Sequence, residues 1–390
     1  MRIALLTDSY YPTKDGVATT VAMMRKSLEE LGHSVWIVAP DPGKDKRCND
    51  PGVLWIRSIR LKSYQGYFVP ILPSLDRERM EALNLDILHV HGVATMAIRG
   101  LALAHILKLP VVMNFHTMVN DVVARYSPIK LPEELLDRGM WIYLRNIMKR
   151  MDAVIVHTPS IGDELLDYVP EIKLLSVIPA AIDTSLFRPG RSGEDFRKRY
   201  NLVGDKKRVF HIGRVSFEKE IDMAIRAIAD VDAELIVVGN GPQREELDRL
   251  VSELKLENKV KFLGFIPDED LAYAYASADT LISCSAFETQ SLTLLEAMSS
   301  GVPCVCRNAR AFKDIIKEGE NGFLFNGDED CAEAIKKGLV ADEGVKNRAR
   351  EYALEHSGVN LAEKTVELYN RIIATKYKPS ENSVREPQHK

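Results

Sequence analysis

The sequence predicts an α/β protein made of two Rossmann-like, doubly wound parallel-sheet domains that face a cleft. Its 390 residues suit two domains, at roughly 100–200 residues per domain. Short apolar runs alternate with helical stretches along most of the chain, and such runs are typical of strands that are buried on both faces of a sheet. The pattern stops and restarts near residue 180, which indicates a second domain of the same class.

The first forty residues predict one β-α-β unit. RIALLTD is expected to be a strand, residues 19–31 place Val21, Met24 and Leu28 at helical spacing, and SVWIVAP is expected to be the next strand. Gly32 ends the helix between them. Such a unit forces a parallel pair of strands with a right-handed crossover. The remaining strands of this half are expected at 86–92, 111–117 and 153–159.

The second half repeats this alternation after a segment with two prolines and little periodicity, residues 176–189, which suits a crossing between domains. Its strands are expected at 209–213, 234–239, 259–264, 280–285 and 303–306, and residues 328–375 have a helical pattern only. We therefore expect domains at 1–180 and 181–358, a C-terminal helix at 359–378 that packs back on the first domain, and a disordered polar tail at 379–390.

Composition excludes several classes of protein. Lys and Arg number 52 against 56 Asp and Glu, which gives no reason to expect a nucleic-acid partner. Five scattered cysteines suit a reducing compartment rather than a disulfide framework. The N-terminus lacks the apolar core of a signal peptide, and no run approaches the roughly 20 apolar residues of a membrane span. A cytoplasmic protein is expected, and attachment to the inner face of the cell membrane stays open.

Open α/β sheets bind ligands at the carboxyl ends of their strands, so polar residues there are candidate site residues. The segment FETQSLTLLEAM carries Glu288 and Glu296, eight residues apart, about a helix expected to start near Ser291. Eight helical residues rise about 12 Å, which suits two ends of one elongated ligand and is too long for one metal ion. The backbone N–H groups of Thr289, Gln290, Ser291 and Leu292 would form an anion site at the helix start. The alternative is that both glutamates are ordinary helix residues.

Two cations follow another predicted strand, in GRVSFEKEID. Arg214 supplies a planar fork and Lys219 a point charge, a pairing that suits a diphosphate. They could equally be surface cations paired with Glu218 and Glu220.

His116 ends the strand VVMNF and could hydrogen-bond a sugar hydroxyl, although a lone histidine at a strand end is more often structural. Gly16 lies in the first β-α loop, where the lack of a side chain permits close approach of the backbone to a phosphate. No G-x-G-x-x-G follows this strand, which argues against an NAD enzyme.

Taken in order, these segments resemble a known family. They are PTKDGVA (12–18), LGHSVWIVAP, FHT, VIPAAID, GRVSFEKEID, VVGNGP, FLGFIP and the E-x7-E of ETQSLTLLEAM followed by SSGVPCV. Each motif is weak alone, but their order over residues 1–375 resembles the retaining GT-B glycosyltransferases of family four. FHTM with Asp121, together with ETQ, is most similar to diacylglycerol glucosyltransferases and sulfoquinovosyl-diacylglycerol synthases, with phosphatidylinositol mannosyltransferases as close seconds. The family often has glycine where this chain has Ser291.

The resemblance implies a role for each candidate residue. Residues 1–180 would bind the acceptor and residues 181–358 the nucleotide-sugar donor. The catalytic residues would be His116 and Glu288 on the donor sugar and Arg214 and Lys219 on its diphosphate. The substrate-binding residues would be Glu296 on the ribose, Ile266 against the base, Gly16 near the diphosphate, and the backbone of Thr289, Gln290, Ser291 and Leu292. It implies no cofactor and no metal.

The implied reaction moves a hexose from a nucleotide diphosphate sugar, UDP-glucose before GDP-mannose, to a lipid or glycolipid hydroxyl. Alternatives are a soluble sugar or sugar-phosphate acceptor, a non-catalytic sugar-nucleotide-binding protein, and an epimerase. Residues 138–150 carry four cations, no acid and several large apolar residues, which suits a helix lying on anionic lipid. The same pattern also suits a core helix whose cations extend outward to solvent. Residues 57–68 form a second basic and aromatic stretch in the same half.

Overall fold

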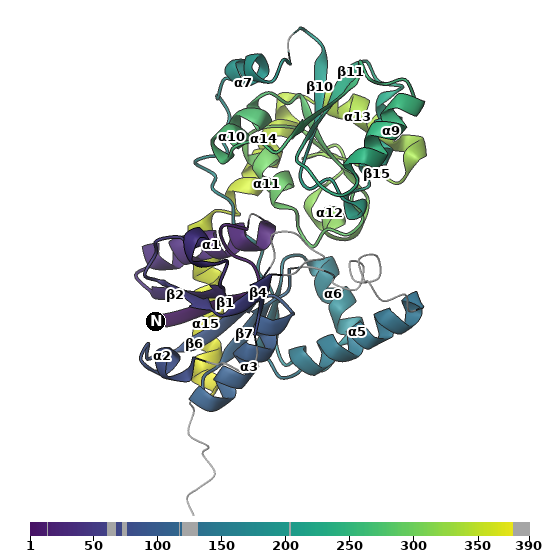
Figure 1. Cartoon of the computed structure of the whole chain (residues 1–390). Helices are drawn as coiled ribbons and strands as arrows, with labels where there is room; N and C mark the ends of the chain where they lie inside the picture. The colour runs from purple at the N-terminus through teal and green to yellow at the C-terminus, as the bar shows by residue number, and fades with distance from the viewer. Residues whose placement is uncertain are drawn as a thin grey trace, which may run out of the picture.

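The computed structural model describes residues 1–13, 15–60, 68–71, 76–116, 118, 132–202 and 204–376. The predicted tail at 379–390, Asp121, and residues 61–67 of the second basic stretch lie outside the described residues. Within them, the chain forms two lobes, each built on a parallel sheet (Figure 1). The prediction of two doubly wound α/β units is therefore confirmed.

The first lobe contains a seven-stranded parallel sheet in the order β3-β2-β1-β6-β7-β8-β9. Its strands are β1 (Arg2–Thr7), β2 (Ser34–Pro40), β3 (Val53–Ile56), β6 (Ile87–His91), β7 (Val111–Asn114), β8 (Ala153–Val156) and β9 (Leu175–Val177). Its helices are α1 (Gly16–Glu30), α2 (Arg77–Glu81), α3 (Thr95–Leu107), α5 (Glu133–Met148) and α6 (Pro159–Tyr168), with a short turn η1 (Lys44–Lys46). A small antiparallel ladder joins β4 (Ser58–Arg60) to β5 (Phe68–Pro70).

The second lobe contains a six-stranded parallel sheet in the order β12-β11-β10-β13-β14-β15. Its strands are β10 (Lys207–Ile212), β11 (Ala233–Val238), β12 (Val260–Gly264), β13 (Thr280–Ser283), β14 (Cys304–Arg307) and β15 (Phe323–Phe325). Its helices are α7 (Glu194–Arg199), α8 (Ile221–Ile228), α9 (Arg244–Glu253), α10 (Asp268–Ala276), α11 (Leu292–Ser299), α12 (Arg310–Ile315), α13 (Asp328–Leu339) and α14 (Glu343–Leu354), with a turn η2 (Phe217–Lys219).

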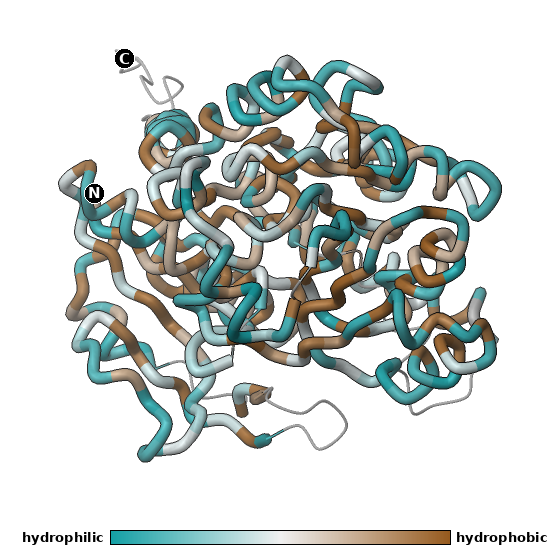
Figure 2. The backbone as a smooth tube through the Cα atoms, turned by 90° about the horizontal axis from the view of Figure 1, so that it is seen from above, coloured by the Kyte–Doolittle hydropathy of each residue, from teal (hydrophilic) through white to brown (hydrophobic). Residues whose placement is uncertain are grey.

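Each sheet is buried on both faces, which explains why its strands are mostly apolar. In the first lobe, Leu6 and Val90 point into one buried cluster, while Ile3 and Leu5 point into another on the opposite face. The brown segments of Figure 2 accordingly gather in the interior, with teal segments toward the outside. The two faces of the second sheet likewise carry separate apolar clusters.

The last helix, α15 (Gly358–Lys376), lies on the first lobe although it follows the second in sequence (Figure 1). Leu368, Tyr369 and Ile372 belong to the same buried cluster as Ile3 and Leu5 of β1. The two crossings between the lobes lie side by side, because Ile182 N donates to the His356 carbonyl at 3.1 Å and forms a parallel bridge with Ser357. The domain boundaries at 180 and 358 stay predictions.

Candidate active site at the lobe boundary

The predicted site residues follow the strands at which each sheet changes direction. In the first sheet the order reverses between the neighbours β1 and β6, and in the second between β10 and β13. Gly16 follows β1, Arg214 and Lys219 follow β10, and Glu288 follows β13. Ligands of open α/β sheets bind outside the carboxyl ends of strands at such switch points. The topology therefore places these four residues at the two positions where binding is expected.

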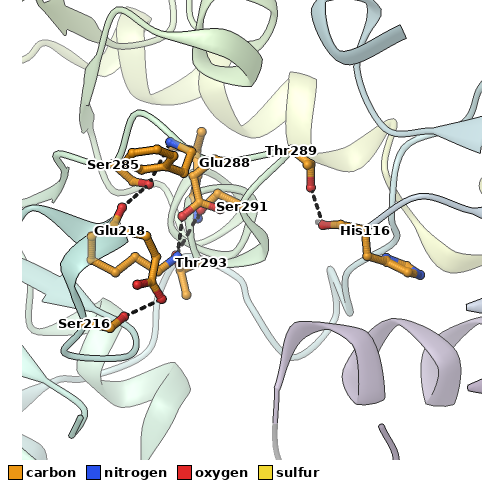
Figure 3. A network of polar contacts seen from close by, with 11 residues as sticks. His116, Ser216, Glu218, Ser285, Glu288, Thr289, Ser291 and Thr293 are labelled. Atoms are coloured by element: carbon orange, nitrogen blue, oxygen red, sulfur yellow. Dashed lines mark hydrogen bonds and ion pairs between the residues drawn. The ribbon is translucent and has the colours of Figure 1, made fainter. Parts of the chain in front are cut away.

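The loops after β10 and β13 are joined by an ion pair and one hydrogen bond, and a second hydrogen bond lies within the loop after β10. Lys219 Nζ pairs with Glu288 Oε1, and both side chains are largely covered. Ser285 Oγ donates to the Glu218 carbonyl at 2.6 Å, and Ser216 Oγ donates to the Glu218 carboxylate at 2.5 Å. Figure 3 shows Ser216, Glu218, Ser285, Glu288 and Ser291 gathered in one group. The predicted cation and carboxylate thus meet, although 69 residues separate them.

Arg214 interacts electrostatically with a carboxylate of each lobe, Glu218 and Asp15. Burial lowers the pKa of its guanidinium, and the carboxylates of Glu218 and Asp15 act in the opposite direction. Asp15 belongs to the first lobe, where its Oδ1 accepts from Ala18 N at 2.8 Å and caps α1. This cap starts α1 at Gly16, three residues before the helix that the apolar spacing predicts. Arginine stays charged despite its lowered pKa, so a partly buried cation faces the start of α1.

The starts of α1 and α11 face each other across the boundary. A Cβ built on Gly16 would lie 3.8 Å from Leu292 Cδ1, an ordinary contact distance. Figure 1 likewise shows α11 and α12 on the side of the second lobe that faces α1 and α6. N–H groups at helix starts favour anions, and because the Asp15 carboxylate already caps α1, the start of α11 is the one of the two that suits a negatively charged ligand. The close approach of a ligand to Gly16 itself stays a prediction.

Ser291 caps α11 in a strained backbone conformation. Its φ is 84°, in the region that favours glycine, and its Oγ accepts from Leu294 N at 3.4 Å. The helix begins at Leu292, so Glu288 precedes it and the two glutamates do not lie on neighbouring faces of one helix. The predicted separation of the two carboxylates along one helix was therefore wrong, because Glu288 lies outside that helix. Glu288 projects from the loop, while only Glu296 belongs to the helix.

Glu296 is buried within α11, with 7% of its surface exposed, and Tyr275 OH donates to its Oε2 at 2.7 Å. Burial raises the pKa of this carboxyl to about 7, and the Tyr275 hydrogen bond opposes the rise. A carboxyl of this kind is costly to ionise without a further hydrogen-bond donor. Ile266 is buried in the same apolar cluster as neighbouring residues of α11. Their predicted contacts with ribose and base stay predictions.

The side chains of Thr289 and Gln290 join the lobes. Thr289 Oγ1 donates to the His116 carbonyl at 2.7 Å, and the Thr289 carbonyl accepts from Thr158 Oγ1 at 3.3 Å. Gln290 Oε1 accepts from Ala180 N at 2.6 Å, and its Nε2 donates to the Ala180 carbonyl at 3.2 Å. In Figure 3 Thr289 points away from Glu288 and toward His116. Substrate contacts by these two residues stay predictions, and in this arrangement their polar side-chain atoms hold the linker and the first lobe.

His116 lies at the boundary with both ring nitrogens bonded to other histidines. Its Nε2 lies 2.9 Å from His91 Nδ1, and its Nδ1 lies 3.1 Å from His157 Nε2. Burial lowers the pKa of His116 well below its ordinary value, and His157 and His89 add to this effect. Sequence reasoning missed His157 and Tyr275. The position of His157 could have indicated it, because His157 directly follows β8, and β8 is the neighbour of β7, the strand that precedes His116.

Comparisons with known proteins show the family of this chain. The chain matches a model described as "Glycosyltransferase Family 4" over residues 14–186 and one described as "Glycosyl transferases group 1" over residues 192–356. It is 30% identical over 387 residues to the alpha-monoglucosyldiacylglycerol synthase of Streptococcus pneumoniae. This match covers 95% of this chain and 85% of that relative. It is also 30% identical over 348 residues to a sulfoquinovosyl transferase of Arabidopsis thaliana, across 86% of this chain and 66% of that relative.

Among solved structures, sucrose-phosphate synthase from Thermosynechococcus elongatus matches with a TM-score of 0.78 at 22% sequence identity. The match covers 96% of this chain and 100% of that one. At this identity the likeness concerns the fold, and it confirms the predicted GT-B architecture.

Proposed function

We propose, on the premise that this chain belongs to the family 4, group 1 glycosyltransferases, that it moves a hexose from a nucleotide diphosphate sugar to a lipid hydroxyl with retention of configuration. Membership makes it a nucleotide-sugar-dependent glycosyltransferase. UDP-glucose is the proposed donor, with GDP-mannose as the alternative, and a diacylglycerol or glycolipid is the proposed acceptor. The name of the relative from Streptococcus pneumoniae, an alpha-monoglucosyldiacylglycerol synthase, supports the lipid acceptor.

The observation that carries the proposal is the meeting of Lys219, Glu288 and the start of α11 after the switch-point strands β10 and β13. We place the donor diphosphate between Arg214, Lys219 and the start of α11, because cations and helix-terminal N–H groups together favour phosphate. Glu288 would then accept hydrogen bonds from hydroxyls of the sugar. Glu296 would accept hydrogen bonds from the hydroxyls of the ribose. These hydroxyls would supply the further donor that the buried carboxyl needs when it is ionised.

The chemistry follows from where charge develops. Breaking the bond between the anomeric carbon and the phosphate oxygen leaves positive character on the sugar and negative charge on the departing diphosphate. Fixed cations and N–H donors stabilise that charge without reorganising, and removing one such group typically costs about 3 kcal/mol in the transition state. In the proposed retaining mechanism the leaving phosphate accepts the proton of the attacking hydroxyl on the same face of the sugar. No nucleophilic side chain is then required.

The proposed membrane contact is the exposed stripe of α5. Five exposed residues recur at helical spacing along α5 and its C-cap: Leu135, Arg138, Ile142, Arg145 and Lys149. Glu134 is exposed on the same helix, and Arg145 pairs with Glu171. Leu135 and Ile142 are each 56% exposed. The opposite side is held in the lobe by Leu144 and Ile147, which are buried, and by Trp141, which stacks on Tyr168 at 3.9 Å. A cationic face with exposed apolar residues suits the surface of anionic lipid. Among the described residues, none of the helices has the length and apolar content that crossing a bilayer needs.

The test is release of nucleotide diphosphate from UDP-glucose, GDP-mannose and ADP-glucose. Each donor is incubated with diacylglycerol in anionic vesicles, with a soluble sugar or sugar phosphate, and without acceptor. UDP release that depends on the vesicles, with an α-linked glycolipid as product, is the expected result. Release that depends only on the soluble acceptor would replace the lipid proposal by its alternative. No turnover of any donor, despite binding, would favour a non-catalytic protein.

A further inference from the structure

Three histidines form a continuous hydrogen-bonded chain beneath the lobe boundary. His91 ends β6, His116 follows β7 and His157 follows β8, and these three strands are neighbours in the sheet. The ring centroids of successive histidines lie 5.2 Å and 5.0 Å apart. The chain starts at the Ile178 carbonyl, which lies 3.0 Å from His157 Nδ1 and two residues before the Ala180 that Gln290 holds.

The carbonyl at one end fixes every proton in this chain. Ile178 O can only accept, so His157 Nδ1 carries a proton and donates it. In a neutral imidazole the other nitrogen is then an acceptor, so His157 Nε2 accepts from His116 Nδ1–H. By the same step His116 Nε2 accepts from His91 Nδ1–H. All three rings therefore carry their proton on Nδ1.

The other end of the chain keeps the rings neutral. His91 is fully buried, and its Nε2 has no hydrogen-bond partner among the described residues. A proton on that atom would be a buried donor without an acceptor, which is costly. Burial lowers the pKa values of His91 and His157, that of His157 to about 4. Among the residues that the structure describes, the ionisable groups that act on the three rings are the rings themselves and His89.

A fourth histidine has the opposite tautomer. His89 Nε2 lies 3.0 Å from Asn114 Oδ1, and its Nδ1 lies 2.5 Å from Tyr369 OH on α15. The amide oxygen can only accept, so His89 carries its proton on Nε2 and accepts from the tyrosine. His89 thus serves as an internal reference within the same cluster. The described residues include no group of three or more His, Cys, Asp or Glu arranged to hold a metal ion.

We infer that His157 and His91 are positioning residues that hold His116 as a neutral Nδ1–H tautomer, with Nε2 as its hydrogen-bond acceptor. The inference rests on the proposed function in one respect, that His116 faces the donor sugar. In the free protein His91 Nδ1–H satisfies the acceptor. A sugar hydroxyl that replaces His91 would have to donate to His116 Nε2, so the tautomer selects a hydroxyl and rejects a group that can only accept. His157 sets this preference through the fixed carbonyl of Ile178.

The tautomers can be read without any assay of activity. Two-bond ¹H–¹⁵N correlation spectra of the full chain labelled with ¹⁵N-histidine distinguish Nδ1–H, Nε2–H and doubly protonated rings. At pH 7.5 we expect His91, His116 and His157 to be Nδ1–H and His89 to be Nε2–H, each assigned by its single substitution. An Nε2–H or charged His116 would overturn the inference, whether or not the protein turns over nucleotide sugars.

Two substitutions at one position then test the consequence. His157→Gln keeps an acceptor near the Nε2 position, whereas His157→Asn keeps only a group near Nδ1 that reaches Ile178. We expect kcat of His157→Gln to stay within about threefold of wild type and that of His157→Asn to fall at least about tenfold, with KM for the donor changing less, because loss of the correct tautomer acts mainly on kcat. Equal losses in both, or a loss confined to melting temperature, would show a structural role only. If the wild type turns over no donor, the proposed function fails while the spectra still decide this inference.

Discussion

Replacing Glu296 by Gln should stabilise the free protein and weaken the donor site at the same time. The carboxyl is buried, its one described hydrogen bond comes from Tyr275, and its pKa is raised to about 7 from an ordinary 4.5. Between these two values the folded chain holds a proton that the unfolded chain has released. Stability therefore falls as pH rises from about 4.5 to about 7, and the loss is complete above the folded pKa.

The size of the effect follows from the same two values. The difference between 4.5 and about 7, at about 1.4 kcal/mol per pH unit, corresponds to about 3 kcal/mol. Glutamine has no charge to bury, and its amide oxygen can still accept from Tyr275. We expect Glu296→Gln to raise the free energy of unfolding by about 3 kcal/mol at pH 8 and to leave it nearly unchanged at pH 4.5. Binding of UDP should weaken roughly tenfold to a hundredfold, because hydrogen bonds to a charged acceptor contribute about 1.5–3 kcal/mol.

Urea unfolding at pH 4.5 and pH 8, and calorimetric titration with UDP, measure the two effects. Glu234→Gln is the matched control, since Glu234 is 6% exposed in the same lobe but lies 3.4 Å from Lys261 Nζ. That substitution removes a cation's partner, so it should not stabilise the lobe and should leave UDP binding unchanged. The reasoning from burial would be refuted if the gain in unfolding free energy of Glu296→Gln over wild type were no larger at pH 8 than at pH 4.5.

Three further predictions concern other parts of the site and the membrane face. Lys219→Ala should lower kcat/KM about 10²–10³-fold, while Lys207→Ala, at the opposite end of β10, should change it less than about threefold. Ser291→Gly should raise the free energy of urea unfolding by up to about 1 kcal/mol because φ is 84°, and Ser291→Ala, which keeps the strain and loses the cap, should lower it. Ile142→Glu should reduce flotation of the protein with anionic vesicles, whereas Val340→Glu, at a residue 82% exposed in the other lobe, should not; equal flotation of both variants would reject the α5 contact.

The fold could be predicted from the sequence because strand burial on both faces produces a local signal. Runs such as RIALLTD and ELIVVG match β1 and β11 closely, since most residues of a doubly covered strand are apolar. The strands β9 and β15 have three residues each, too few to form a recognisable run. The positions of Gly16, Arg214, Lys219 and Glu288 could also be predicted, because a parallel sheet brings the ends of its strands to one edge.

The histidine chain and the roles of Thr289 and Gln290 could not be predicted in this way. Each depends on a partner more than 20 residues distant, or on the other lobe, and on the direction in which a side chain points. The prediction for Thr289 and Gln290 concerned their backbone N–H groups and stays a prediction, while the structure shows that their side chains bind backbone groups of His116 and Ala180. A motif identifies residues that share a loop, but it does not separate those that face a ligand from those that fix the loop.

One loop carries both candidate site residues and residues that bind the first lobe and the linker, so the site is coupled to the angle between the lobes. Glu288 and Ser291 flank Thr289 and Gln290 directly, and the latter two hold the His116 carbonyl and both backbone polar groups of Ala180. A rotation of the lobes about the linker must therefore either break those three hydrogen bonds or move the loop that carries Glu288. Breaking them would leave buried polar groups unpaired, at about 1–3 kcal/mol each, whereas moving the loop shifts Glu288 relative to Lys219, its ion-pair partner. Occupancy of the donor site and the angle between the lobes should accordingly change together.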